Sequence, residues 1–424
     1  MNFFSRENPD RWYQLAWLLC VITLPWIDKA NNVSLIFLTC LWIMDGSIIK
    51  RWHLLKSDRW VWPFFLYFIL LVVGMVYSPD IDKAIFTLEK KITFIVLPLI
   101  AITGRQLSPK FIGFLKLSFV YSCVFMILLN LGATAVYFFL GDLAFNFDPN
   151  SQAVFSSMHP EASPIWMHFS YIHLLQWSGL HPAYFSMYLV FGMVILFNEE
   201  YSSSTQRNIH ILLGFIMSCF IALLSTRIAI IAFVACALYM GAKRIMEKRV
   251  TAAFLVLAVG FVLGLLVWLN PVARFRVIEE PVKTSYRVNQ ETTNFNSVNY
   301  RLLEWQGSWS IIRANFFSGV GTGGGISAMS NFYANYSKET AGLEYDPHNQ
   351  YLQTWLELGL AGLFALLLCI FAPLFRPNVE QSYVAFILIF SLMCLTESIG
   401  ERQKGIVFFT LFQSLFLAFE KKST

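Results

Sequence analysis

Residues 345–351 read Tyr-Asp-Pro-His-Asn-Gln-Tyr, and they separate a long polar segment from a long apolar one. Asp346 is a candidate N-cap, and Pro347 suits the first position of a helix. The pattern predicts a helix that begins here and runs into a membrane, with His348 in its first turn. Because a helix N-terminus disfavours the imidazolium, we expect the His348 ring to be neutral.

The composition of the chain is that of an integral membrane protein. Of its 424 residues, 57% are hydrophobic and 13% are charged, whereas a soluble domain carries about 25% charged residues. Apolar runs near the roughly 20 residues that span a bilayer recur along the whole length. The net charge of +5 is therefore no sign of nucleic-acid binding, and we expect membrane lipids but no nucleic acid as partners.

Twelve apolar segments are predicted to be membrane spans. They are residues 12–28, 33–49, 60–77, 84–103, 112–140, 183–197, 208–225, 227–242, 251–270, 351–374, 382–397 and 404–419. With both termini in the cytoplasm, most basic connections lie inside, as the positive-inside rule requires. Two long loops, residues 141–182 and 271–350, then lie outside. We expect an all-α, polytopic protein in which residues 1–424 form one membrane domain.

The topology places four polar side chains at the outer membrane level, although they are far apart in the sequence. They are His181, Arg227, Arg301 and His348. Convergence of such groups at one level is what a site for a membrane-borne substrate needs. Glu397, at the outer end of the eleventh span, is a further costly charge and is expected to balance Arg227 or Arg301.

Arg227 follows a very short hairpin, which forces it to the membrane edge. An ionisable group there has a partner or a ligand, because leaving it alone is costly. Its planar fork of donors suits anionic oxygens. The alternative interpretation is an anchor that snorkels to the interface.

Arg301 lies inside the second loop, on a helix predicted over residues 299–312 because apolar residues recur at 302, 305, 309 and 312. Asn299 is its predicted N-cap. A cation in the first turn opposes the helix dipole, so Glu304 or an anionic ligand is expected to compensate Arg301. The alternative is an exposed helical ion pair between Arg301 and Glu304.

A neutral imidazole at His348 can accept a proton from a hydroxyl group, with Asp346 or another carboxylate to orient the ring. The alternative is a histidine that caps the helix or hydrogen-bonds at the interface. His181, which precedes Pro182, repeats the pattern and is equally suited to capping a helix or to positioning a ligand.

Neither a metal nor a cofactor is expected. A metal site built from His159, His168, His173 and His181 is disfavoured, because no fixed histidine spacing supports it. Residues 319–325 are rich in glycine but lack the lysine of a phosphate-binding loop, so they are predicted to form a flexible turn.

Several segments resemble, in order and in kind, the O-antigen ligase/polymerase superfamily of bacterial envelope enzymes. They are SPDIDKAIFTLEKKI (78–92), HPAYFSMYL (181–189), STRIAIIAF (225–233), NYRLLEWQGSWSIIRANFFSGVGTGGG (299–325) and DPHNQYLQTWLELGLAGL (346–363). The last two are the most specific. The resemblance covers residues 182–420 well and the first half by hydropathy only. An extended basic loop for a phosphorylated core is missing, which leaves the acceptor open.

The resemblance implies a metal-independent, GT-C-like glycosyltransferase in the bacterial inner membrane, with its site facing the periplasm. Such enzymes move a glycan from undecaprenyl pyrophosphate to a hydroxyl of lipid A-core, of another lipid-linked glycan or of a protein. By the family's motif, His348 activates the acceptor, and Arg227 and Arg301 hold the pyrophosphate. The candidate supporting residues are His181, Asp346, Asn349 and Glu397.

The chemistry of the reaction agrees with this assignment. Displacement of a diphosphate at the anomeric carbon needs a base near the acceptor oxygen and positive charge on the leaving group. A base opposite the leaving group predicts inversion. Two other classes are weighed against it: a lipid-linked sugar transporter, which expects charges deep within broken helices, and a membrane scaffold, which gives Arg227 and His348 no role.

Overall fold

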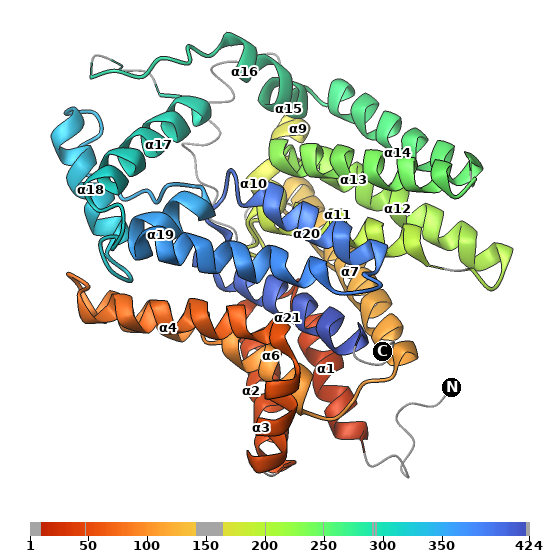
Figure 1. Ribbon diagram of the computed structural model, residues 1–424. Helices are drawn as coiled ribbons and strands as arrows, with labels where there is room; N and C mark the ends of the chain where they lie inside the picture. The colour runs from red at the N-terminus through yellow and green to blue at the C-terminus, as the bar shows by residue number, and fades with distance from the viewer. Residues whose placement is uncertain are drawn as a thin grey trace.

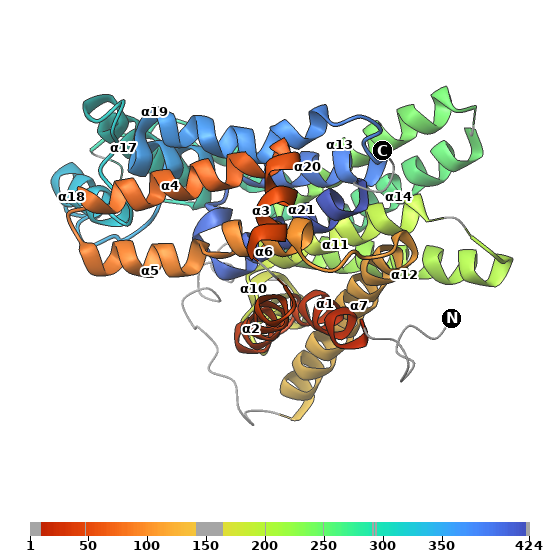
Figure 2. The same cartoon turned by 60° about the horizontal axis from the view of Figure 1, so that its bottom comes forward.

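The computed structural model describes residues 10–46, 48–140, 164–199, 201–248, 250–290, 292 and 295–420. In these residues it contains helices and no strand, which confirms the all-α class. Figure 1 and Figure 2 show the long helices crossing one another in a bundle, with α17 and α18 at one end and α14 at the other. Most of the first predicted loop, residues 141–163, lies outside the described residues, as does His159.

The helices are named by their order along the chain. Those of the first part are α1 (Arg11–Thr23), α2 (Asp28–Met44), α3 (Ile48–Ser57), η1 (Arg59–Val61), α4 (Trp62–Val76), α5 (Ile81–Lys91), α6 (Thr93–Thr103) and α7 (Pro109–Leu140). Those of the middle part are α9 (Pro164–His168), α10 (Tyr171–Leu174), α11 (Pro182–Asn198), α12 (Ser204–Leu224), α13 (Arg227–Met246), α14 (Val250–Leu269), α15 (Pro271–Arg274), the π-helical turn η2 (Phe275–Glu279) and α16 (Glu280–Lys283). Those of the last part are α17 (Ser297–Ala314), α18 (Gly325–Tyr336), α19 (Gln350–Phe371), η3 (Ala372–Phe375), α20 (Gln381–Met393), η4 (Ile399–Glu401) and α21 (Gln403–Glu420).

Each of the twelve predicted spans contains a helix, but fewer are long and apolar enough to cross a membrane. Among the described residues, five qualify: Arg59–Val76, Pro109–Leu140, Ser204–Leu224, Arg227–Met246 and Gln350–Phe375. A sixth qualifies if Ala258–Leu269 and Pro271–Lys283, which meet at 96°, are one broken span. The helices Pro182–Asn198, Gln381–Met393 and Gln403–Ala418 are apolar but shorter. The chain is therefore a membrane protein, and the count of twelve spans stays a prediction.

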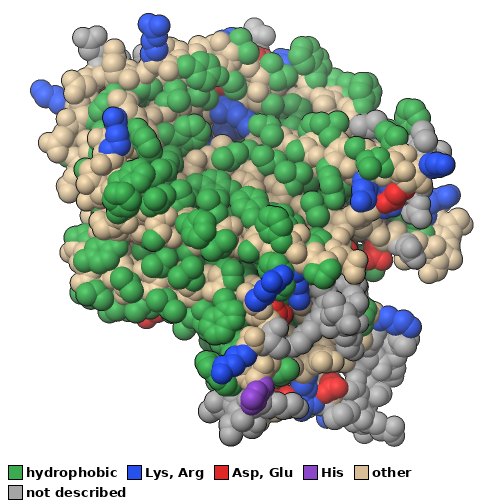
Figure 3. Space-filling model, in the orientation of Figure 1, with side chains coloured by type: hydrophobic (Ala, Val, Ile, Leu, Met, Phe, Trp, Pro, Cys, Tyr) green, Lys and Arg blue, Asp and Glu red, His purple; other side chains and the backbone are tan. Residues whose placement is uncertain are grey.

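The core of the bundle is built around a cluster of phenylalanine rings in tilted and edge-to-face contact. Phe191 of α11 lies 5.1 Å from Phe386 of α20 and 4.8 Å from Phe412 of α21, measured between ring centroids. Around this centre, α11 packs on α7, α12 and α20, and α21 packs on α6. Many other large apolar side chains stay exposed, as Figure 3 shows for one face of the molecule, which fits helices that face lipid.

The helix predicted inside the second loop is present as α17, but it begins earlier than predicted. Its N-cap is Asn296, not Asn299: the Asn296 side chain accepts hydrogen bonds from the backbone N–H groups of residues 298 and 299, both at 3.0 Å. A small cluster of Leu303, Ile312, Met329, Tyr333 and Leu356 holds α17 and α18 against the start of α19. Of the four predicted apolar positions only Ile312 is buried, because residues 302 and 305 line a cavity instead.

Helix α19 is broken at Gly359, whose φ of 65° and ψ of −166° are not helical. The segment that leads from α17 to α18 lies against this break. Val320 N–H donates to the Leu356 carbonyl and Gly321 N–H to the Glu357 carbonyl, both at 2.9 Å. A Cβ atom on Gly359 would collide with the backbone of Phe317. The predicted glycine turn is present, with positive φ at Gly319, Gly321 and Gly323, but it is docked and not flexible: it satisfies carbonyl groups that the break leaves open.

Candidate active site

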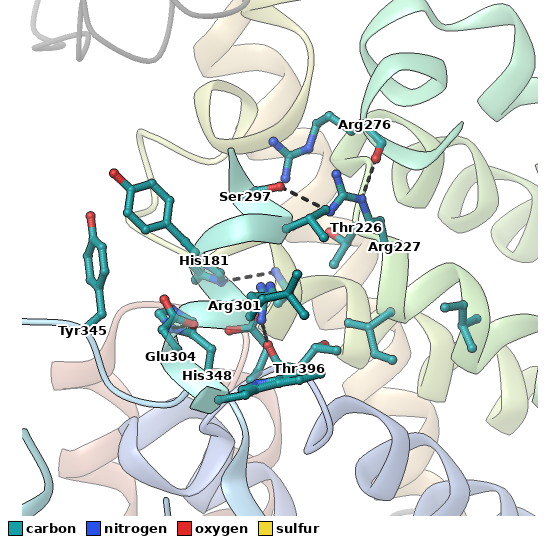
Figure 4. A pocket seen from close by; sticks show the side chains of 18 of the residues that line it. His181, Thr226, Arg227, Arg276, Ser297, Arg301, Glu304, Tyr345, His348 and Thr396 are labelled. Atoms are coloured by element: carbon teal, nitrogen blue, oxygen red, sulfur yellow. Dashed lines mark hydrogen bonds and ion pairs between the residues drawn. The ribbon is translucent and has the colours of Figure 1, made fainter. Parts of the chain in front are cut away.

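A cavity of about 600 Å³ lies where α11, α13, α17 and the segment before α19 meet. Side chains from these separate parts of the chain surround one space, as Figure 4 shows. Figure 3 shows a hollow with basic side chains on its wall, in the part of the face where α15, α16 and α17 are drawn. Five of the predicted site residues line the cavity: His181, Arg227, Arg301, His348 and Glu397.

His348 lies just before α19 and not in its first turn. The predicted cap Asp346 is wrong; the N-cap is Asn349, whose side-chain oxygen accepts hydrogen bonds from the N–H groups of Tyr351 and Leu352, both at 3.0 Å. His348 has a φ of 43°, in the left-handed region, so a helix cannot continue through it. Asp346 fixes this turn, because its carboxylate accepts from the His348 N–H at 2.7 Å and from the Ser398 hydroxyl at 2.8 Å.

The His348 ring is oriented by a glutamate from α17. Its Nδ1 lies 3.1 Å from Oε2 of Glu304, a buried carboxylate, and 3.2 Å from the backbone oxygen of Asp346. Both neighbours are acceptors, so Nδ1 carries the proton. In the neutral ring, Nε2 is then the nitrogen that can accept one.

The charge state of His348 in the ligand-free site differs from the expectation. Burial lowers its pKa, but the hydrogen bond to Glu304 and the charges of Glu304, Asp346 and Glu397 outweigh burial and raise the pKa to about 9. The expectation of a neutral ring is therefore wrong near neutral pH. It rested on a helix dipole, whereas His348 precedes the helix and three carboxylates lie near it.

Arg301 is held across the cavity by residues from the end of α20. Its Nη2 lies 2.9 Å from Oε1 of Glu397, and its Nη1 donates to the backbone oxygen of Thr396. The expected balance between Glu397 and Arg301 is thus present. The alternative of an exposed Arg301–Glu304 pair is wrong, because Glu304 turns to His348. Since α17 begins at Ser297, Arg301 also lies beyond the first turn, and the helix dipole no longer disfavours it.

Arg227 opens α13 and points into the cavity rather than to the membrane surface. Its guanidinium donates to Oε2 of Glu280 and, at 3.2 Å, to the hydroxyl of Ser297, while its Nε donates to the backbone oxygen of Arg276. Glu280 in turn accepts from the Ser297 hydroxyl at 2.8 Å. These contacts contradict the interpretation of Arg227 as a snorkelling anchor.

His181 serves as the N-cap of α11 and also lines the cavity. Its Nδ1 accepts a hydrogen bond from the Ala183 N–H at 3.3 Å, which places the ring proton on Nε2. Burial lowers the pKa of His181, so its ring is neutral where that of His348 is charged. The neutral ring can therefore present an N–H donor to a bound molecule.

No group of three or more His, Cys, Asp or Glu side chains that could hold a metal ion occurs in the part of the chain that the structure describes. Of the histidines once weighed as ligands, His168 packs on the ring of Tyr137, with centroids 5.7 Å apart. His181 is occupied as a cap, as described above.

Sequence reasoning missed several residues of the cavity. Glu304 had been assigned to Arg301 because it follows one turn later on the same helix, and periodicity does not show contacts with a distant segment. Arg276, Glu280 and Ser297 fall in a loop that carried no pattern. Tyr171, which lies beneath the Arg276 guanidinium, falls in the first predicted loop, where no residue but His181 was singled out for the site.

Backbone strain gathers around the cavity. Five non-glycine residues of the described chain have a positive φ, and three of them lie at or beside this site: Tyr171 and Ser225, each with a φ of 53°, and His348. Ser225 directly precedes Thr226 and Arg227. Such conformations cost about 1–3 kcal/mol each and persist where the surrounding structure enforces them, often at functional sites.

Comparison with known families assigns the segment that carries most of these residues. Residues 212–367 match the family model described as O-Antigen ligase. This match supports assignment to the O-antigen ligase/polymerase superfamily. No curated protein matches the sequence. The resemblance drawn from the motifs is thereby confirmed.

The matched residues of the chain run from within α12 to near the end of α19. They contain Arg227, Arg301, Glu304 and His348, together with the loop that carries Arg276. His181 and Glu397 lie outside it and reach the cavity from α11 and from the end of α20. The site is therefore completed by segments on both sides of the matched region.

Proposed function

We propose that this protein is a metal-independent, inverting glycosyltransferase that moves a glycan from undecaprenyl pyrophosphate to an acceptor hydroxyl. It acts on the periplasmic side of the bacterial inner membrane, and lipid A-core is the first acceptor to consider. The observation that carries the proposal is one cavity that holds a carboxylate-oriented histidine together with Arg227 and Arg301. Membership of the O-antigen ligase family supports it.

In the proposed reaction, the acceptor oxygen attacks the anomeric carbon of the donor and gives its proton to Nε2 of His348. The bond between that carbon and the diphosphate oxygen breaks, and the diphosphate leaves with the electron pair. Arg227 and Arg301 stabilise the charge that develops on the leaving group, since a guanidinium donates in pairs to phosphate oxygens. Attack opposite the leaving group inverts the anomeric centre.

Glu304 orients His348 and, in the transition state, stabilises the imidazolium that proton transfer produces. The neutral His181 ring presents its Nε2–H to the bound substrate. Asp346 and Asn349 act indirectly, by positioning His348. Asp346 fixes the turn at His348, and Asn349 caps the N-terminus of α19, which follows His348. Glu397 holds Arg301 in place before the diphosphate arrives.

The transporter alternative has one structural feature in its favour, because α19 is broken at Gly359. That break, however, is closed by the protein's own backbone at residues 316–321 and not open to a solute. Lys91 and Glu401, which are charged groups away from the cavity, are paired with each other at 2.5 Å. The glycosyltransferase proposal accounts for the cavity residues, and the transporter alternative becomes an outcome of the test.

The proposal predicts glycan transfer by the purified protein. Reconstituted in lipid nanodiscs with an oligosaccharide linked to undecaprenyl pyrophosphate, it is expected to release the diphosphate and to extend an acceptor without added metal. Lipid A-core, a second lipid-linked repeat and an acceptor protein are offered separately, and product gels show which is extended. Transfer to none of the three, with movement of the donor across a proteoliposome bilayer, contradicts the proposal and favours a transporter.

The pH dependence of the reaction tests the role of His348. A base must be neutral, and the pKa of His348 is about 9, so kcat/KM is expected to rise about tenfold per pH unit below that value and to level off above it. In Glu304→Gln the largest influence that raises the pKa is lost, and the rise should move to lower pH. The exposed Glu339→Gln is the matched control and should leave the profile unchanged. A rate that falls as pH rises through 9 shows instead that the imidazolium is the active form.

A further inference from the structure

A third arginine, Arg276, lines the cavity, and the reaction described above does not use it. Its guanidinium carbon lies 3.5 Å from the centre of the Tyr171 ring, so the planar group is stacked on the aromatic face. Figure 4 shows Arg276 on the same side of the cavity as Arg227 and Ser297. Arg276 belongs to the π-helical turn η2, a type of irregularity that is frequent at functional sites.

The segment that carries Tyr171 is fastened to the helix that leads into Arg276. The Asn270 amide donates to the hydroxyl of Ser170 at 3.3 Å. Tyr171 itself has a left-handed backbone with a φ of 53°. A tyrosine pays a steric cost in this conformation. The ring is therefore placed under the guanidinium by the surrounding structure and not by local preference.

The charges of the cavity are balanced except at Arg276. Arg227 is paired with Glu280, Arg301 with Glu397, and His348 with Glu304. No carboxylate of the described residues forms an ion pair with Arg276, and its buried Nε has no hydrogen-bond partner there. A buried donor without a partner is costly, at roughly 1–3 kcal/mol. Arg276 thus carries the positive charge and the free donors that an anionic group entering the cavity meets.

We propose that Arg276, held flat by Tyr171, is the principal ligand of the donor diphosphate in the ground state. This inference rests on the proposed function. Arg227 and Arg301 must first share or release their glutamates, whereas Arg276 needs no such exchange. The Arg276 backbone oxygen accepts a hydrogen bond from Nε of Arg227. Binding of the diphosphate at Arg276 is therefore expected to affect the position of the Arg227 side chain as well. Arg276 is therefore expected to govern donor affinity more than the rate of the chemical step.

The experiment measures binding of undecaprenyl pyrophosphate to the full-length protein in nanodiscs, with inorganic pyrophosphate as a second probe. Arg276→Gln is expected to weaken binding roughly 10- to 100-fold, as loss of a charge-assisted contact does. Arg276→Lys should recover part of the lost affinity, because the positive charge remains but the paired donors of the guanidinium are lost. Tyr171→Leu should weaken binding less than Arg276→Gln, since the guanidinium is present but no longer held.

Arg274→Gln is the matched control. Arg274 lies two residues earlier, at the end of α15; it is paired with Glu279 at 3.1 Å and does not line the cavity. Its loss should change binding of either probe less than twofold, with roughly equal melting temperatures for all variants as evidence of folding. In transfer assays Arg276→Gln should raise KM for the donor with a much smaller change in kcat, a split that a purely structural role would not produce.

Four outcomes are distinguishable. If the Arg276→Gln variant binds both probes more weakly and the Arg274→Gln variant does not, the inference is supported and Arg276 contacts the diphosphate itself. If Arg276→Gln weakens binding of the lipid probe alone, the inference is supported for the lipid-linked headgroup only. Unchanged binding of both probes by Arg276→Gln overturns the inference and leaves the proposed function standing. Failure of the unaltered protein to bind either diphosphate overturns the proposed function, and this inference with it.

Discussion

Replacement of His348 by alanine is expected to reduce glycan transfer by a factor of about 100 to 10,000 at an unchanged protein level, as loss of a general base does. Nδ1 of this ring is engaged with Glu304 and the Asp346 backbone. Nε2 is therefore the ring nitrogen that accepts the proton of the acceptor hydroxyl. The arginines, which stay protonated, cannot take over this role. The measurement is the rate of transfer in nanodiscs, together with glycan ladders from a deletion strain that carries each variant.

A second variant keeps this test informative if alanine disturbs the fold. His348→Asn tolerates the left-handed backbone and retains an N–H donor for the buried Glu304, but it cannot accept a proton as the imidazole does. It should fold and still fail to transfer. His53→Ala, which alters an exposed histidine on α3, is the control and should transfer normally. Undiminished ladders from His348→Asn would falsify the assignment of His348 as the base.

Loss of either Arg227 or Arg301 is expected to lower glycan transfer about 100- to 1,000-fold, the usual effect of removing one donor to a developing negative charge. Arg301 and Arg227 are each paired with a buried glutamate. Replacing one arginine therefore also leaves the carboxylate of its glutamate buried without a counter-charge. Breaking a buried pair in this way costs about 3–5 kcal/mol of stability. The single variants Arg301→Gln and Arg227→Gln therefore mix a catalytic effect with a structural one.

Double variants separate the two effects. Arg301→Gln with Glu397→Gln, and Arg227→Gln with Glu280→Gln, remove both charges of a pair and should restore the melting temperature toward that of the unaltered protein. Transfer should stay low, because the charge on the leaving group is still uncompensated. Lysine at 301 or 227 should recover part of the activity, since the charge remains without the fork. If the double variants regain transfer with stability, the arginines hold the fold and do not act on the diphosphate.

The sequence predicted which side chains meet better than it predicted how they pair. Placing the polar side chains at one expected membrane level predicted a common site, and His181, Arg227, Arg301, His348 and Glu397 do lie at one cavity. Pairing is decided by side-chain contacts between segments far apart in the chain, which no periodicity reports. The partner of Arg301 is 96 residues away, while the nearby Glu304 contacts His348.

The predicted helix starts were wrong where two residues near each other were both suitable N-caps. Asp346 and Asn349 both suit an N-cap, and the backbone conformation of His348 between them decides for Asn349. Asn296 and Asn299 competed in the same way at the start of α17, and the earlier residue caps the helix. The span count had a different difficulty: hydropathy marks apolar runs, but helices such as Gln381–Met393 are apolar without the length to cross alone.

The docking of residues 316–321 into the break at Gly359 has a consequence for how the protein is made. The carbonyl groups of Leu356 and Glu357 accept from the backbone N–H groups of Val320 and Gly321, in a segment synthesised earlier. Until that segment docks, this stretch has open hydrogen-bonding groups that lipid cannot satisfy. Biogenesis must therefore bring the preceding loop to α19 before the helix settles in the bilayer.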